Sequence, residues 1–260
     1  MTVQVQKVGA VNGLKWIVDG FALFLLRPLV WIALAAIWLL LALGLLLANP
    51  NLGQLILYLL TPALGAGLLV GCRALERGND LEIAHLFAGC RSHPGPLITI
   101  GGVYLLGNVI TFGAFMMLGG DRIIAAALER ASDPNAPPPD IPAAPLLSVL
   151  LLVPLFMAVI FAPALAMFRN LPALEALKAS FTACVANLAP VLLFAAVSAV
   201  LAMLGMLLFA MVSVVLPMLA VLLYGLGTLV WIPVNAGAVY RGYQALFGRD
   251  APPEETSTPA

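Results

Sequence analysis

Charged residues are scarce in this sequence, and their scarcity decides its class. Only 9% of the 260 residues are charged while 63% are hydrophobic, against roughly 25% charged residues in ordinary soluble domains. No charged residue occurs between Arg27 and Arg73, and none occurs between Lys178 and Arg241. Few water-soluble folds bury that much apolar surface, so the composition predicts a polytopic, all-α membrane protein.

Several classes of function are excluded by what else is missing. Twelve Lys and Arg balance twelve Asp and Glu, which leaves no basic surface for nucleic acid. The three cysteines have no C-x-x-C spacing, so a structural zinc site is not expected. No Ser-His-Asp arrangement, phosphate-cradling glycine loop or pair of membrane-facing carboxylates can be assembled from the chain. We therefore expect a protein without enzymatic activity, cofactor or metal.

Long apolar runs are what the sequence has instead. A membrane span needs about 20 mostly apolar residues, and turn-forming residues at 49–53 and at Pro217 divide the two longest runs. The predicted spans are 28–48, 53–72, 96–119, 146–168, 188–211 and 215–240.

The distribution of Lys and Arg favours six spans over seven. With six, ten of the twelve Lys and Arg fall on the side that holds both termini, and only Arg122 and Arg130 fall on the other. Cytoplasmic loops carry the excess of basic residues, so both termini are predicted to be cytoplasmic. The apolar stretch after Arg27 is longer than the core of a cleaved signal peptide, so none is expected.

The stretch 161–195 keeps three charges inside a very apolar chain, and helical periodicity explains two of them. Glu175 and Lys178 lie opposite an apolar stripe, with Asn170 as the expected cap and Pro172 in the first turn. The stripe consists of Leu171, Leu174, Leu177, Phe181, Cys184 and Leu188. This pattern predicts an amphipathic helix lying along the cytoplasmic membrane surface between spans 4 and 5.

The same design recurs between spans 2 and 3. Asn79 and Glu82 resemble a capping box, and an apolar stripe follows at Ile83, Leu86, Phe87 and Cys90. We predict a second cytoplasmic surface helix there.

Matching landmarks in the two regions predict an internal repeat. Pro-Ala-Leu at 62–64 recurs at 163–165, and a Phe-x-x-Cys follows each copy. The predicted repeats are parallel hairpins at about 53–119 and 146–211, which lack the inverted topology that frames many transporter sites. Pro62 and Pro163 hold matched positions and are expected to kink both spans.

A stripe of small residues occurs in the second span. Gly67 and Gly71, preceded by Ala63, let another segment approach closely. A neighbouring span and a second subunit are both open as partners, and packing within the chain is favoured.

The remaining segments belong to one integral membrane domain over 1–248. Residues 1–27 are amphipathic, and Trp16 is expected in the headgroup zone. Tyr240 and Tyr243 are expected to anchor the end of span 6 at the same interface.

Two segments are predicted to be extended or unstructured. Residues 120–145 form an external, proline-rich loop that begins with a short helix. Residues 249–260 are polar and proline-rich and are expected to be a disordered tail.

Polar residues inside the spans are few and uncharged. Asn108 and Asn235 are expected to form hydrogen bonds with neighbouring helices, and a place in a substrate pathway is the alternative. The others are Thr111, Ser198 and Tyr224. Because the spans hold no Asp, Glu, Lys or Arg, the sequence shows no proton or ion path.

One cluster of metal-ligand residue types occurs, Glu82-x-x-His85 with Cys90 and His93 nearby. A helical Glu-x-x-His pair holds half of a di-iron site and needs a second such pair. The second hairpin has a lysine in the comparable place, so the cluster is interpreted as the water-facing side of a surface helix.

Three stretches resemble a known family: KWIVDGFALFLLRP, FAPALAMFRNLPALEALKASFTACVANLAP and YRGYQALFG. They look like an uncharacterised group of proteobacterial inner-membrane proteins, which is similar to the YciC-like proteins and to the membrane domain of some glycerophosphodiester phosphodiesterases. The resemblance covers essentially the whole chain and implies a six-span protein of the bacterial cytoplasmic membrane. It transfers no catalytic residue, since that chemistry belongs to a separate soluble domain.

We therefore expect an integral membrane protein that is not an enzyme and acts in the cell envelope through contacts with membrane lipids or protein partners. A second copy of the chain and another membrane protein are both open as partners, and nucleic acid is excluded. The alternative is a permease for a small uncharged or lipid-like substrate, with Asn108 and Asn235 in its pathway.

Overall fold

The computed structural model describes residues 4–133 and 143–248, and nearly all of them are helical. This part of the chain contains no strand. Six helical segments within it are long and apolar enough to cross a membrane: Pro28–Ala48, Pro50–Glu76, Pro94–Arg130, Ala144–Arg169, Leu188–Val215 and Pro217–Phe247. The predicted all-α fold with six spans is confirmed.

Four of these segments are single helices and two are composite. The single ones are α2 (Pro28–Ala48), α3 (Pro50–Glu76), α10 (Leu188–Val215) and α11 (Pro217–Phe247). The third segment contains α5 (Pro94–Phe115), a wide turn η2 (Met116–Gly120) and α6 (Asp121–Ser132). The fourth contains η3 (Ala144–Leu151), α7 (Leu152–Val159) and α8 (Ala162–Arg169). The helices outside the spans are α1 (Asn12–Leu26), η1 (Ile83–Phe87), α4 (Ala88–Ser92) and α9 (Ala173–Ala186).

Proline and asparagine set the helix boundaries at the predicted turns. Pro50 and Pro217 each stand in the first turn of a span, where the missing N–H has no partner to lose. The side chain of Asn49 caps α3, because its Oδ1 accepts a hydrogen bond from the Leu52 N–H at 3.0 Å. Both turns predicted from the longest apolar runs are confirmed.

The third span ends where it was expected to end. Gly119 has a φ of 95°, a left-handed conformation that glycine adopts readily, and the chain bends there into α6. This helix confirms the short helix predicted at the start of the external loop. The proline-rich remainder of that loop and the predicted tail at 249–260 lie outside the described residues.

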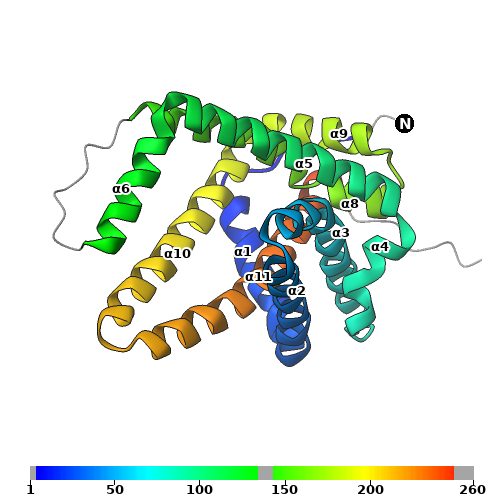
Figure 1. Ribbon diagram of the computed structural model, residues 1–260. Helices are drawn as coiled ribbons and strands as arrows, with labels where there is room; N and C mark the ends of the chain where they lie inside the picture. Colours follow the sequence, from blue (N-terminus) through cyan, green and yellow to red (C-terminus); the bar gives the residue numbers. More distant parts are fainter. Residues whose placement is uncertain (1–3, 134–142, 249–260) are drawn as a thin grey trace, which may run out of the picture.

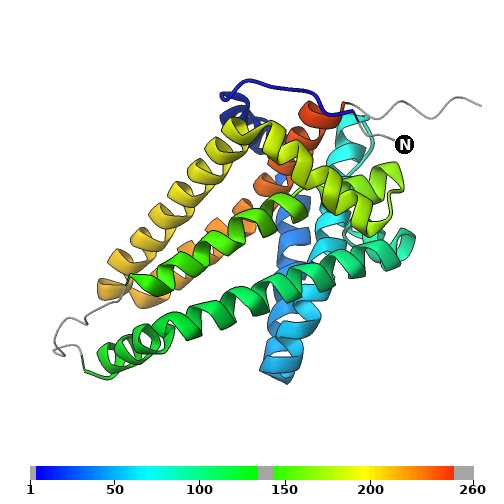
Figure 2. The ribbon, with the colours of Figure 1, turned by 90° about the horizontal axis from the view of Figure 1, so that it is seen from above.

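The helices are gathered at one end of the bundle and spread at the other (Figures 1 and 2). Polar contacts between distant segments join Arg27 to Asp80, Glu76 to Arg241, and His93 to Asn170. We call this end, which holds the ends of α3, α8 and α11 with α4 and α9, the basic end. Away from it, the α10–α11 hairpin and the α5–α6 arm extend outwards (Figure 2).

The fourth span is broken at residues 160–161, where the sequence predicts one continuous helix. Pro163 explains the break, because its ring displaces the carbonyl four residues earlier and offers it no N–H. Ser180 of α9 fills the gap. Its hydroxyl donates to the Met157 carbonyl at 2.8 Å and accepts from the Phe161 N–H at 3.2 Å, the two groups that an unbroken helix would pair with each other. The predicted kink is thus present at Pro163, whereas α3 continues through Pro62.

α1 packs one of its faces into the bundle. Gly20 crosses Gly237 so closely that a Cβ on Gly20 would lie 2.5 Å from backbone atoms of α11. This approach buries Trp16, whose ring meets that of Phe161 edge-on at 6.3 Å between centroids. The expected placement of Trp16 in the headgroup zone is therefore wrong.

Tyr240 and Tyr243 do not anchor the chain at an interface either. Both are fully buried, because α11 continues between α3 and α8 and turns these rings inwards. The Tyr240 hydroxyl donates to Glu76 at 2.6 Å, and the Tyr243 hydroxyl accepts from Arg169 Nε at 3.2 Å.

Besides its apolar and polar faces, α9 has a third face that packs against the protein, which the sequence did not predict. Small side chains let it approach α7 and α8 closely, so Leu174 and Phe181 of the predicted stripe are 63% and 40% exposed. Asn170 does not cap α9, because it ends α8 in a left-handed conformation with φ 53° and Pro172 precedes α9. The buried residues are Ala173, Ala176, Leu177, Ser180, Ala183 and Cys184.

α9 and α1 each present three faces. One face is buried in the protein, a second is apolar and exposed, and a third is polar and exposed. On α9 the exposed apolar residues are Leu174, Phe181 and Val185, and the polar ones are Glu175, Lys178 and Thr182. On α1 they are Leu14, Val18, Phe21 and Leu25, opposite Lys15 and Asp19.

The segment between spans 2 and 3 is a turn followed by a short helix, not one regular amphipathic helix. Glu82 is its cap, one turn later than predicted: the Glu82 N–H donates to Nδ1 of His85 at 3.0 Å, and the Glu82 side chain accepts in return. Ile83 of the predicted stripe is exposed, whereas Leu86 is buried.

The small-residue stripe of α3 packs against the segment η1–α4. A Cβ on Gly67 would collide with the Leu86 carbonyl, and one on Gly89 would collide with the Ala63 carbonyl. The favoured packing of the stripe within the chain is therefore confirmed, and its main partner is η1–α4, not a span.

Candidate functional site: an intramembrane cavity

An apolar cavity of about 580 Å³ lies among α2, α3, α5, α11 and the broken fourth span. Sites for small molecules commonly have volumes of roughly 300–1,000 Å³. None of the described residues that line it is charged; its polar lining consists of Thr61, Tyr104, Asn108 and Asn235. The cavity is suited to an uncharged, mostly apolar molecule.

Asn108 and Asn235 line this cavity from α5 and α11, but their hydrogen bonds differ from those predicted. Asn108 Nδ2 donates to the Tyr104 carbonyl at 2.8 Å, and Asn235 Nδ2 donates to the Trp231 carbonyl at 3.1 Å. Each acceptor lies four residues earlier on the same helix. The prediction of bonds across helices is wrong, because the cavity separates the helices at this level.

The two asparagines lie deep in the apolar part of the bundle. With a rise of about 1.5 Å per residue, each is about 20 Å along its helix from the basic end. In a helix that crosses a bilayer upright, this distance reaches the middle region of the hydrocarbon core, which is about 30 Å thick.

The matched prolines of the predicted repeats meet at the cavity. Pro62 of α3 and Pro163 of α8 both line it. The break before Pro163 contributes to its wall through Val159 and Ile160. The sequence singled out these prolines as bends, favoured ordinary packing around them and left a cavity shaped by the bends as the alternative.

The other polar residues of the spans lie elsewhere. Thr111 donates to the Gly107 carbonyl on its own helix at 2.9 Å. Tyr224 lines a separate hollow of about 300 Å³ between α10 and α11. The buried hydroxyl of Ser198 has no hydrogen-bond partner among the described residues.

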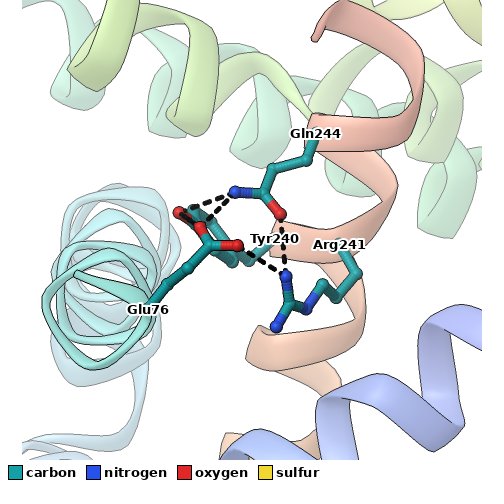
Figure 3. Close-up of polar contacts among 4 residues, drawn as sticks. All are labelled: Glu76, Tyr240, Arg241 and Gln244. Atoms are coloured by element: carbon teal, nitrogen blue, oxygen red, sulfur yellow. Dashed lines mark hydrogen bonds and ion pairs between the residues drawn. The ribbon is translucent and has the colours of Figure 1, made fainter. Parts of the chain in front are cut away.

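At the basic end, three side chains of α11 hold Glu76 of α3 (Figure 3). Arg241 donates to Oε1 at 2.7 Å, and the Tyr240 hydroxyl donates to Oε2 at 2.6 Å. Gln244 donates to the same Oε2 and accepts from Arg241 at 3.1 Å. The ion pair is about three-quarters buried, with exposed fractions of 24% for Arg241 and 23% for Glu76. A carboxylate so fully engaged is typical of a structural brace, and it fixes α3 to α11 beside the cavity.

Sequence reasoning missed this brace. It assigned Glu76 to a loop, and 165 residues separate the carboxylate from Arg241. The available signal was the spacing of Tyr240 and Gln244, which places both side chains on one face of a helix.

Asn187 is a second polar contact that the sequence did not reveal. It is buried between α9 and α10, where its Oδ1 accepts from the Val8 N–H at 2.9 Å and its Nδ2 donates to the Gln6 carbonyl at 3.0 Å. The Gln6 N–H in turn donates to the Leu246 carbonyl at 2.8 Å. The N-terminal segment is thereby fastened to α9 and α11.

The metal-ligand residue types around Glu82 are not assembled as ligands. Glu82 and His85 cap their own turn, and His93 Nε2 is 2.7 Å from Oδ1 of Asn170. Across the described ranges, no group of three or more His, Cys, Asp or Glu is placed to hold a metal ion.

Six helical segments that are long and apolar enough to cross a membrane, five of which line an uncharged cavity, define a polytopic helical membrane protein. The chain is 28% identical over 193 residues to a probable inner membrane protein of Burkholderia thailandensis, and the alignment covers 71% of each chain. No protein-family model and no solved structure matches the sequence.

Proposed function

We propose that this protein acts in the bacterial inner membrane through contacts with membrane lipids, without catalysing a reaction, and that its cavity holds a lipid-like molecule. The name of the Burkholderia relative supports the location. The observation that carries the function is the uncharged cavity that α3, α5 and α11 line. A second copy of the chain or another membrane protein is a further proposed partner.

The nature of the lining supports a lipid-like occupant. An empty space of this size would leave the surrounding side chains without contacts on one side. Water gains little from an apolar lining, and engineered apolar cavities stay dry. A hydrocarbon chain recovers those contacts.

The three-faced helices support the proposed lipid contacts. A helix that is buried on one side, apolar on the second and charged on the third fits a position at the boundary between protein, lipid and water. With α9 in that position, Phe181 would face acyl chains and Glu175 would face water.

Filling the cavity tests the proposal. Gly65 lines it, and a Cβ there would meet no described atom within 4 Å, so Gly65→Phe should occupy the space without breaking the fold. We expect lipid to co-purify with the native protein after gentle solubilisation and to be reduced several-fold in this variant, measured by mass spectrometry.

The matched control is Gly44→Phe, which also adds a ring at an open glycine but lies outside the cavity lining. It should keep the native lipid content. Absence of bound lipid from the native protein, or equal lipid in all three proteins, would refute the proposed function.

A permease for a small uncharged or lipid-like substrate is the second candidate. The observation that favours it is that Asn108 and Asn235 share one cavity, as a substrate pathway requires. Proteoliposomes should then show flux of such a solute, and Asn235→Leu should abolish it. A lipid-binding protein without transport would show none.

We also propose that the basic end faces the cytoplasm, with both termini on that side. Nine of the eleven Lys and Arg among the described residues belong to segments at this end, and the other two lie in α6. Cytoplasmic loops carry the excess of basic residues.

Thiol labelling tests this orientation. Cys90 is half-buried at the basic end, whereas Cys184 is buried and its burial raises the pKa of its thiol to about 12. The thiolate is the reactive form, so between about pH 7 and 9 Cys184 should stay unlabelled while Cys90 reacts. An impermeant maleimide should label Cys90 in inside-out vesicles and not in intact spheroplasts.

A Thr182→Cys variant extends the test, since this position is exposed on the polar face of α9. Labelling of either site from the outer face would reverse the proposed orientation. Rapid labelling of Cys184 would show instead that α9 is not packed as described.

The wider relation to the YciC-like proteins and to the phosphodiesterase membrane domain stays a prediction, which rests on the three sequence stretches. This relation supports a location in the bacterial cytoplasmic membrane. It does not support a catalytic function, because the resemblance brings no catalytic residue.

A further inference from the structure

We infer that the cavity selects uncharged amphiphiles that carry a hydroxyl group, such as a long-chain alcohol or a diglyceride, over amphiphiles that can only accept hydrogen bonds. This inference rests on the proposed function and specifies the ligand class of the same site. It is carried by the way Asn108 and Asn235 use their amide groups.

The backbone fixes the orientation of both amides. A carbonyl oxygen only accepts hydrogen bonds, so the atom of Asn108 that faces the Tyr104 carbonyl at 2.8 Å is the NH₂ nitrogen. The same argument holds for Asn235 and the Trp231 carbonyl at 3.1 Å. The Oδ1 oxygen is thus the group that each amide keeps for another partner.

An amide oxygen in an apolar cavity needs a donor. No described residue donates to Oδ1 of Asn235, and Thr61 already uses its hydroxyl proton on the Leu57 carbonyl at 2.7 Å. A ligand hydroxyl can donate to such an oxygen and can also accept from the N–H groups of the lining. A methyl ether of the same chain length cannot donate and leaves the oxygen desolvated without a partner, which is costly.

Charge sets the second limit on the ligand. The cavity offers no described cationic or anionic side chain, and an unpaired charge at mid-membrane depth is strongly unfavourable. The part of the ligand that reaches the asparagines is therefore neutral, which excludes phosphate, carboxylate and ammonium groups at that position.

Quenching of tryptophan fluorescence measures this preference. Trp38 and Trp231 line the cavity, and a bromine atom on a bound alkyl chain quenches nearby indoles. The probes are a long-chain alcohol brominated near its chain end and the methyl ether of the same alcohol, added to the purified protein. We expect the alcohol to reach half-maximal quenching at a concentration about tenfold lower than the ether, the discrimination that one or two unmade hydrogen bonds produce.

Two variants complete the design. In Asn108→Leu with Asn235→Leu, residues of similar volume remove both oxygens, so the alcohol should lose its advantage while the ether still binds. In Trp38→Phe with Trp231→Phe, quenching that persists reports probe dissolved in the detergent or lipid and is subtracted.

The outcomes separate the two proposals. Equal quenching by alcohol and ether in the native protein would overturn the hydroxyl preference and leave lipid binding in the cavity intact. Tenfold preference that survives in the double leucine variant would overturn the role of the asparagines. Absence of cavity-dependent quenching by either probe would overturn the proposed function itself.

Discussion

Replacing Ser180 with alanine should destabilise the folded protein by about 2–5 kcal/mol, because two fully buried backbone groups lose their shared partner. Ser180 is 0% exposed, so water cannot take the place of the hydroxyl. The Met157 carbonyl and the Phe161 N–H, each within 3.2 Å of Oγ, would be left unpaired at the break in the fourth span. The thermal unfolding midpoint in one detergent measures the loss.

The matched control is Thr182→Ala, two residues further along α9. Its hydroxyl is exposed and donates only to the Lys178 carbonyl of its own helix at 2.8 Å, so its loss should change stability by less than about 0.5 kcal/mol. Ser180→Cys keeps a weak donor and should lie between the two. If Ser180→Ala and Thr182→Ala unfold together, the bridge across the break contributes nothing.

Gly101→Ala and Gly102→Ala should have opposite effects although the positions are adjacent. A Cβ on Gly101 would lie 2.5 Å from the Leu59 carbonyl oxygen and 2.7 Å from its Cα, so α3 and α5 would have to separate. Among the described residues, a Cβ on Gly102 would meet no atom within 4 Å. Overpacking of this kind costs roughly 1–3 kcal/mol, and the change from glycine to alanine in a helix gains at most about 1 kcal/mol.

The pair forms its own control because the gain in helix propensity is common to both variants. We expect Gly101→Ala to lower the unfolding midpoint and Gly102→Ala to leave it unchanged or raise it. Equal midpoints would mean that α3 and α5 do not meet at Leu59, which would also remove one wall of the cavity.

The sequence predicts the spans well because their ends carry strong local signals. α2 begins and ends at the predicted residues 28 and 48, since Pro28 and the Asn49-Pro50 pair mark both boundaries. The length of an uncharged run and the positions of prolines depend only on residues that are close together in the sequence. Both can therefore be recognised without knowledge of the fold.

Side-chain direction was predicted less well, and α9 shows the reason. Periodicity separates the apolar stripe that contains Leu174 and Phe181 from the polar face and assigns the stripe to the membrane side, but it does not show which residues pack against other helices. Within a membrane, large apolar side chains are equally stable against lipid, and small ones allow close helix packing. The buried face of α9 is accordingly built mainly from alanine, serine and cysteine.

Contacts between residues that are distant in the sequence could not be predicted from it. The amides of Asn108 and Asn235 were identified as a candidate pathway, but nothing local indicates that α5 and α11 border the same space. The same holds for Ser180, whose role depends on a break that lies 19 residues earlier. Such sites require knowledge of which helices are neighbours.

The fastening of the N-terminal segment has a consequence for biogenesis. Gln6 and Val8 find their partners at Asn187 and Leu246, which leave the ribosome after most of the chain has been synthesised. Gln6 and Val8 are therefore among the last residues to dock although they are synthesised early, and a nascent chain halted before Leu246 should keep the segment around them accessible to protease.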